Sequence, residues 1–95
     1  MVTLTAKLTI KEGKEKDFET TMRDKVVPEV RKEPGNRAYT FCRSKDNPRV
    51  FMFYEEYVDQ AAFDAHRKHL GELGVNLGEL LDGAPTLEFY DKIAS

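Results

Sequence analysis

The amino-acid sequence predicts an α+β domain in which helices cover one face of a four-stranded antiparallel sheet. Apolar and polar residues alternate along residues 2–10, apolar residues recur every four positions along residues 14–32, and the remaining segments complete the order β-α-β-β-α-α-β. If the last two helices form one crossover, this order matches the split βαβ arrangement of ferredoxin-like domains. We expect a single domain over residues 1–95, because a chain of this length suits one small core.

The first strand and the first helix have the clearest patterns. Threonine and lysine separate the apolar residues of the first strand, which is typical of a strand with one buried face. The stripe that predicts a helix over residues 14–32 consists of Phe18, Met22, Val26 and Val30. Pro28 lacks a backbone donor, so we expect a kink or a break near residues 24–28. Val27 lies off the stripe, which suggests that the kink changes its direction.

The middle of the chain predicts a β-hairpin. Residues 33–36 contain proline and glycine and end the first helix. Residues 37–44 and residues 49–58 are rich in aromatic and β-branched side chains, and the polar run between them favours a turn.

The last third of the chain predicts two helical segments and a final strand. Asp59 is a good N-cap for a second helix, whose stripe includes Ala62, His66 and Leu70. Gly71 weakens this helix, and a further leucine-rich segment extends to Asp82. A short strand is expected at about residues 86–93.

The third strand is apolar on both of its faces, which indicates that both faces of the sheet are covered. Phe51, Phe53 and Tyr57 alternate with Val50, Met52 and Tyr54. The chain has enough helices for one face only, so the simplest cover for the other face is a second copy of the same sheet. We therefore expect a homodimer.

Composition excludes several classes of protein. The net charge is −2 with acidic and basic residues interspersed, so there is no basic stripe for nucleic acid. Cys42 is the only cysteine, which excludes an internal disulfide and fits a reducing compartment. No segment has the roughly 20 apolar residues that a membrane span needs, and no signal peptide is apparent. We expect a cytoplasmic protein without nucleic-acid or membrane partners.

Three segments in a fixed order resemble the antibiotic biosynthesis monooxygenase family, and the similarity covers nearly the whole chain. They are Glu33-Pro34-Gly35 followed by Tyr39, Phe51-x-x-Tyr54-Glu55-x-Tyr57, and Asp59-Gln60-x-Ala62-Phe63-x-x-His66. The resemblance implies a dimeric α+β barrel with a pocket in each subunit between helices and sheet. It also implies oxidation of quinols or anthrones by dioxygen without a metal or flavin, isomerisation of small keto compounds, or haem degradation. The haem branch is argued against, because residues 2–10 contain no asparagine and the chain has no tryptophan.

His66 is the leading candidate for a catalytic base, because imidazole titrates near neutral pH and its stripe must face the sheet. A core histidine that is hydrogen-bonded to a neighbour is the competing interpretation. Glu55 is the second catalytic candidate, because a buried carboxylate needs a partner. It could orient His66 or bind substrate, or it could form a structural ion pair with Arg43 or Arg37 across the hairpin.

The candidate substrate-binding residues are mostly aromatic, and plain core packing is the alternative for them. They are Tyr39, Phe41, Tyr54, Tyr57 and His69. His69 follows His66 by one turn, but this pair lacks a third ligand at helical spacing, so we expect no metal. The chain also has no glycine-rich phosphate loop, no cysteine cluster and none of the haem-branch residues, so we expect no other cofactor.

The leading functional hypothesis is a cofactor-independent monooxygenase that oxidises a small aromatic, quinol- or anthrone-like substrate with dioxygen. One alternative is an isomerase that uses the same base to move a proton next to the carbonyl of a keto compound. The other alternative is a dimer that binds a small ligand without turnover, because a fold does not determine a function.

Overall fold

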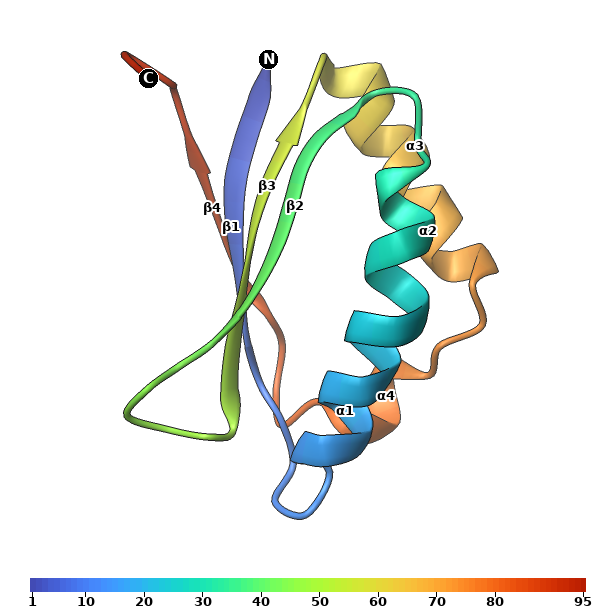
Figure 1. Cartoon of the computed structure of the whole chain (residues 1–95), viewed down its shortest axis with the longest axis vertical. Coiled ribbons are helices and arrows are strands. Elements are labelled where there is room, and N and C mark those ends of the chain that lie inside the picture. The colour runs from blue at the N-terminus through green and yellow to red at the C-terminus, as the bar shows by residue number, and fades with distance from the viewer.

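The computed structural model describes all 95 residues and contains one four-stranded sheet. Its strands are β1 (Val2–Thr9), β2 (Asn36–Arg43), β3 (Val50–Tyr57) and β4 (Thr86–Tyr90), in the order β2-β3-β1-β4 (Figure 1). All three neighbouring pairs are antiparallel. One helical crossover joins β1 to β2 and a second joins β3 to β4, which is the predicted ferredoxin-like α+β arrangement. The last strand ends at residue 90, three residues earlier than expected.

The predicted first helix forms, but its middle turn is wider than an α-helix. It comprises α1 (Glu15–Thr21), a π-helical turn η1 (Met22–Val26) and α2 (Val27–Arg31), which follow one another along one rod (Figure 1). Pro28 occupies the first turn of α2, where a missing amide is tolerated. The expected kink or break is thus a π-turn just before the proline. Residues of the predicted stripe are at most 3% exposed: Phe18, Met22, Val26 and Val30.

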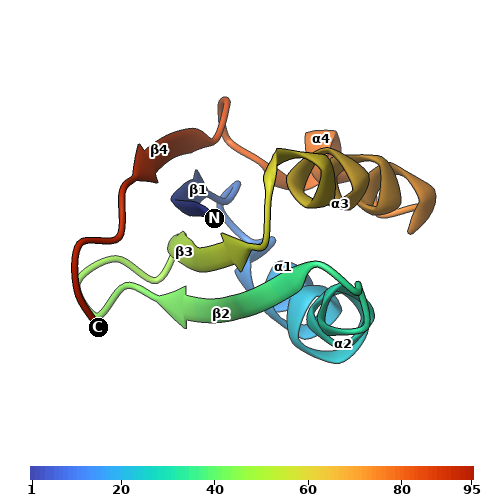
Figure 2. The ribbon, with the colours of Figure 1, turned by 90° about the horizontal axis from the view of Figure 1, so that it is seen from above.

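The second helical layer begins at the predicted cap. The carboxylate of Asp59 accepts a hydrogen bond from the amide of Ala62 at 2.8 Å, and α3 (Gln60–Glu72) follows. Gly71 lies inside this helix rather than ending it. The leucine-rich segment forms only the short α4 (Leu77–Leu80). Seen from above, all helices lie on one side of the sheet (Figure 2).

The connection from α4 to β4 is tied to the end of β1. Ile10 and Leu81 form a β-bridge, and the amide of Asp82 donates to the carbonyl of Thr9 at 2.8 Å. Arg49 donates to the carbonyl of Ile10 at 2.8 Å and to Asp82 at 2.6 Å. These bonds hold the crossover against the sheet.

The opposite face of the sheet is not covered by any helix (Figure 2). As the alternation along the third strand predicts, Val50, Met52 and Tyr54 lie on this face, where their side chains are half-buried. The C-terminal residues pass over part of the face, where Lys92 donates to Glu56 at 3.0 Å. No helix is both long enough and apolar enough to span a bilayer.

Candidate active site

A cavity of about 190 Å³ lies between the sheet and the helices. Three quarters of its lining residues are hydrophobic, among them Leu4, Ala6, Met22, Phe53, Leu70 and Leu77. Four polar side chains interrupt this lining, namely Tyr39 of β2, Glu55 of β3, and His66 and Arg67 of α3. A mostly apolar cavity with a few convergent polar groups is the usual form of a small-molecule site.

His66 lies inside because its helix presents the predicted stripe to the sheet. The residue is 2% exposed, and its ring centroid lies 4.9 Å from that of Tyr57 and 5.4 Å from that of Tyr39. Its Nδ1 atom is 3.2 Å from both carboxylate oxygens of Glu33, and its Nε2 atom is 3.6 Å from Oε1 of Glu55. Since an ionised carboxylate only accepts hydrogen bonds, this network assigns the ring proton to Nδ1. Nε2 then carries the lone pair of the ring.

Burial keeps the imidazole of His66 neutral. Loss of solvent lowers its pKa below the ordinary value, while the charge of Glu33 and the hydrogen bond from Nδ1 to Glu33 act in the opposite direction. Glu33 is therefore the carboxylate that favours the protonated form of the ring. A neutral imidazole near pH 7 is able to accept a proton.

Glu55 is 4% exposed, and burial shifts the pKa of its carboxyl group upward, in the opposite direction to that of His66. Burial raises its pKa to about 7, the nearby charge of Glu33 adds to this rise, and the hydroxyl of Tyr57, which donates to Oε1 at 2.7 Å, opposes it. The alternative of an ion pair with Arg43 or Arg37 is wrong. Arg43 pairs with Glu19 of α1, and no ion pair or hydrogen bond joins Arg37 to Glu55.

Among the side chains of Tyr39, Glu55 and His66, three polar atoms have no hydrogen-bond partner in the chain: Oη of Tyr39, Oε2 of Glu55 and Nε2 of His66. Each of these three atoms is at least partly accessible from the cavity. The only polar side-chain atom that is both fully buried and without a partner is an oxygen of Glu15. Burial also raises the pKa of Tyr39, so its hydroxyl keeps its proton. The cavity thus offers one donor, one acceptor and one carboxyl group that titrates near neutral pH.

Four of the predicted site residues do not line this cavity. Tyr54 lies on the opposite face of the sheet and donates to Glu56 at 2.6 Å. Period-2 alternation explains this, since neighbours in a strand point to opposite faces. Tyr57 is fully buried, and its hydroxyl donates a hydrogen bond to Glu55. His69 lies on the outer side of α3, where its Nδ1 atom is 2.7 Å from Oε2 of Glu33.

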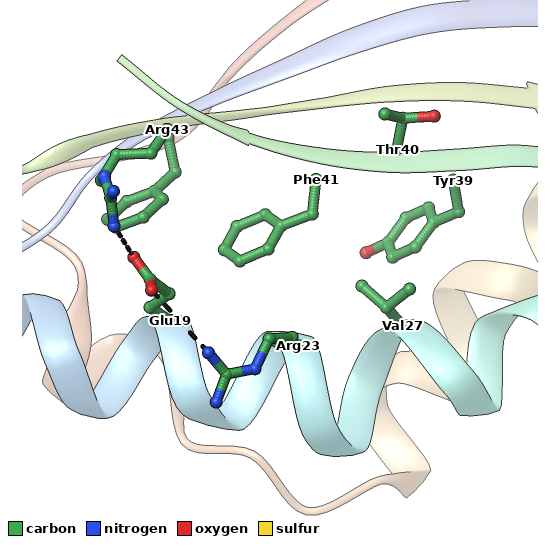
Figure 3. A pocket seen from close by; sticks show the side chains of 8 residues that line it. Glu19, Arg23, Val27, Tyr39, Thr40, Phe41 and Arg43 are labelled. Carbon is green, nitrogen blue, oxygen red and sulfur yellow. Dashed lines mark hydrogen bonds and ion pairs between the residues drawn. The ribbon is translucent and has the colours of Figure 1, made fainter. Parts of the chain in front are cut away.

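The fourth residue, Phe41, lines an open groove of about 490 Å³ between β2 and the first helix (Figure 3). Glu19, which pairs with Arg43 and lies 4.0 Å from Arg23, closes one end of the groove. Tyr39 lies at the other end and also lines the cavity. Tyr39 is therefore the one residue that lines both the groove and the cavity.

Glu33 is the residue that the sequence analysis missed. It was placed in the turn that ends the first helix and in a segment that resembles the family, but it was given no role in the site, whereas its carboxylate contacts both histidines of α3. Gly35 allows this approach, because a Cβ atom at residue 35 would overlap with the Cβ atom of Ala62. The Glu-Pro-Gly segment was the available signal, since it combines an acidic residue with a glycine that permits close packing.

The side chains of the site are not arranged to bind a metal ion. No group of three or more histidine, cysteine, aspartate or glutamate side chains has a geometry that could hold one. Glu33 with its two histidines is instead a hydrogen-bonded chain of three residues.

Comparisons with known proteins agree with this architecture. The family model for antibiotic biosynthesis monooxygenases matches residues 1–71, which include His66. One similar solved structure is an antibiotic biosynthesis monooxygenase with 26% identity and a TM-score of 0.85, covering 99% of this chain and 100% of that one. A conserved protein from Methanosarcina mazei has 27% identity and a TM-score of 0.84, covering 96% and 91% of the two chains.

A protein from Shewanella oneidensis has 29% identity and a TM-score of 0.79, covering 94% of this chain and 87% of that one. A search of proteins with curated functions finds no significant match. The family match covers most of the chain, and the structural matches cover almost all of it. The chain therefore belongs to the antibiotic biosynthesis monooxygenase family.

Proposed function

We propose that the protein is a cofactor-independent monooxygenase that oxidises a small aromatic quinol or anthrone with dioxygen in the cavity beside His66. The observation that carries the proposal is the group of unpartnered polar atoms in an otherwise apolar cavity. Membership of the family and the neighbour described as a monooxygenase support a general monooxygenase-like role. The substrate and the reaction are our inference from the site.

The first step is transfer of the acidic proton of the substrate to Nε2 of His66. This atom is the free acceptor, because Nδ1 is bonded to Glu33. Glu55 at 3.6 Å stabilises the resulting imidazolium when it is ionised. Tyr39 donates its hydroxyl to the substrate oxygen on which negative charge develops. The apolar lining excludes water, which strengthens these interactions.

The substrate anion then supplies all the electrons that dioxygen needs. An electron-rich anion passes one electron to dioxygen, the two radicals combine, and water leaves. One oxygen atom enters the product and the other becomes water, so that an anthrone plus dioxygen yields an anthraquinone plus water. Two carbon–hydrogen bonds are replaced by one carbonyl, and no external reductant enters the balance. The protein has only to move protons and to shape the cavity.

A homodimer is part of the proposal. The open face of the sheet carries the half-buried residues Val50, Met52 and Tyr54, and Tyr90 and Ile93 beside it are 50% and 96% exposed. A second copy of this sheet would cover these residues. The proposed partners are thus a second copy of the chain, the small aromatic substrate and dioxygen.

The test is a panel of quinols and anthrones incubated with the protein under air and under argon. We expect oxygen uptake equal to the amount of quinone formed, no product under argon, and one labelled oxygen atom in the product when ¹⁸O₂ is used. An uncatalysed oxidation rate for every compound of the panel would contradict the proposal.

An isomerase remains the second candidate because the Nε2 atom of His66 and the carboxyl group of Glu55 form two adjacent proton sites. One site removes a proton next to a carbonyl, and the other returns a proton to the neighbouring atom. Incorporation of solvent deuterium into a keto substrate without oxygen uptake would favour this function over oxidation.

A further inference from the structure

Glu33 connects the two histidines of the chain through a single carboxylate. Its Oε2 atom is 2.7 Å from Nδ1 of His69 and 3.2 Å from Nδ1 of His66. These three residues come from the end of the first helix and from α3, and the contacts span 33 and 36 positions in the sequence. The arrangement is therefore a product of the tertiary fold.

The two ends of this chain of residues face different environments. His66 lines the cavity, and its side chain is 3% exposed. His69 and Glu33 line a separate open hollow of about 390 Å³ on the outer side of α3 and the turn at Gly35, and the side chain of His69 is 30% exposed. The three side chains thus connect the interior of the cavity with the solvent.

We propose that His66, Glu33 and His69 form a proton relay that carries the proton of the substrate from the cavity to bulk water. His69 and Glu33 are relay residues that act through His66 and do not contact the substrate. The inference rests on the proposed function for its direction, since the reaction in the cavity supplies the proton. The relay itself is a property of the free protein.

The transfers follow from the atoms that are in contact. When Nε2 of His66 accepts a proton, the proton on Nδ1 passes to the carboxylate of Glu33. Glu33 delivers it to Nδ1 of His69 once exchange with water has placed the ring proton of His69 on Nε2. That Nε2 proton leaves to solvent, and the ring of His66 is then neutral with its proton on Nε2. When Nε2 gives this proton to the hydroxide that leaves as water, the same transfers run in reverse and restore the Nδ1 proton, so the turnover releases no net proton. Each step moves one proton and changes no other bond.

The groups that face His66 favour this exit. From the sheet, Tyr39 and Tyr57 keep their protons, because burial raises the pKa of both hydroxyls. Glu55, the other carboxyl group near His66, bonds to the buried hydroxyl of Tyr57 and leads to no exposed group. Arg67 on α3 lines the cavity but forms no hydrogen bond or ion pair with His66 or Glu33. The hydrogen-bonded chain of titratable groups that leads from His66 to a partly exposed side chain passes through Glu33.

The relay is testable without turnover, because His66 and His69 are the only two histidines. Histidine side-chain NMR at low temperature measures how fast the Nδ1 proton of His66 exchanges with water. We expect His69→Gln, whose amide still donates to Glu33, to slow this exchange by at least ~10-fold. The matched control is Lys68→Gln on the exposed side of the same helix, which should leave the exchange rate unchanged.

Added imidazole, a small mobile proton carrier, should restore fast exchange in His69→Gln. Unchanged exchange in His69→Gln would overturn the relay, because the proton would then leave by another route. Slow exchange in both glutamine variants would also overturn it, since the effect would not be specific to His69. If His69→Gln does not fold, His69→Asn provides the same comparison.

A turnover assay separates this inference from the proposed function. With an active substrate, His69→Gln should lower kcat by at least ~10-fold at unchanged KM, and imidazole should restore kcat. Wild-type protein with rapid His66 exchange but no oxygen uptake would contradict the proposed function and leave the relay standing. Normal turnover with slow exchange in His69→Gln would overturn the catalytic use of the relay.

Discussion

Replacement of Glu55 by glutamine should stabilise the protein above neutral pH. Glutamine has nearly the same volume, and its side-chain oxygen can still accept the hydrogen bond from Tyr57. It removes the charge that the buried site disfavours, because burial raises the pKa of Glu55 from 4.5 to about 7. The variant therefore isolates the free-energy cost of an ionised carboxylate at this position.

The sign and the size follow from the two pKa values. Between pH 4.5 and about 7 the folded chain keeps a proton on Glu55 that the unfolded chain has lost, so the free energy of unfolding of the wild type falls as pH rises through this window. A shift of this size corresponds to about 3 kcal/mol once both states are ionised. Glu55→Gln should equal the wild type near pH 4 and exceed it by up to ~3 kcal/mol near pH 8.

The assay is urea unfolding followed by circular dichroism across this pH range, at one fixed protein concentration because dissociation of a dimer would depend on concentration. Glu56→Gln is the matched control from the opposite face of the same strand. Hydrogen bonds from Tyr54 and Lys92 lower the pKa of Glu56, so this variant should be less stable than the wild type at high pH. A Glu55→Gln variant that is no more stable than the wild type near pH 8 would refute the argument.

Three further predictions concern activity, packing and assembly. The value of kcat/KM should rise with pH through about 7, because protonated Glu55 can donate to Nε2 of His66 and occupy its lone pair. A pH–rate profile tests this prediction, and the Glu55→Gln variant should not show the rise. Gly35→Ala should lower the free energy of unfolding by about 1–3 kcal/mol, because the added Cβ overlaps with Ala62. Adding Ala62→Gly should recover much of this loss, as measured by urea unfolding. A Gly35→Ala variant with unchanged stability would show that the overlap is absent. Light scattering at micromolar concentration should give twice the monomer mass of 10.9 kDa, and the monomer mass itself would contradict the dimer.

The fold was predictable from the sequence because local patterns determine each of its main elements. Alternation in residues 2–10 and the stripe on the first helix both report a buried face, and the structure buries those faces. The π-turn was not predictable in the same way. Pro28 predicts only that the regular hydrogen-bond ladder is interrupted, and whether the helix breaks, kinks or widens depends on how its stripe packs on the sheet.

The position of a site residue was predictable where the face of its helix or strand determines the direction of the side chain. His66 lies inward because it shares a stripe with apolar neighbours, and Glu55 shares a strand face with Phe53. The same alternation places Tyr54 on the other face, so its assignment to the cavity conflicted with the pattern of its own strand. The bond between Glu33 and His69 was not predictable, because it depends on the close approach of the turn at Gly35 to α3.

The central claim is that His66 accepts the proton of the substrate in the cavity. Its most direct test is the rate of oxygen uptake by wild type and His66→Ala with an active quinol or anthrone, expressed per folded protein. We expect a loss of at least ~10²-fold, the usual scale for a lost general base, with the variant still folded. A wild-type rate per folded protein in His66→Ala, together with a lowered melting temperature, would show that His66 is a packed core residue and would contradict the account.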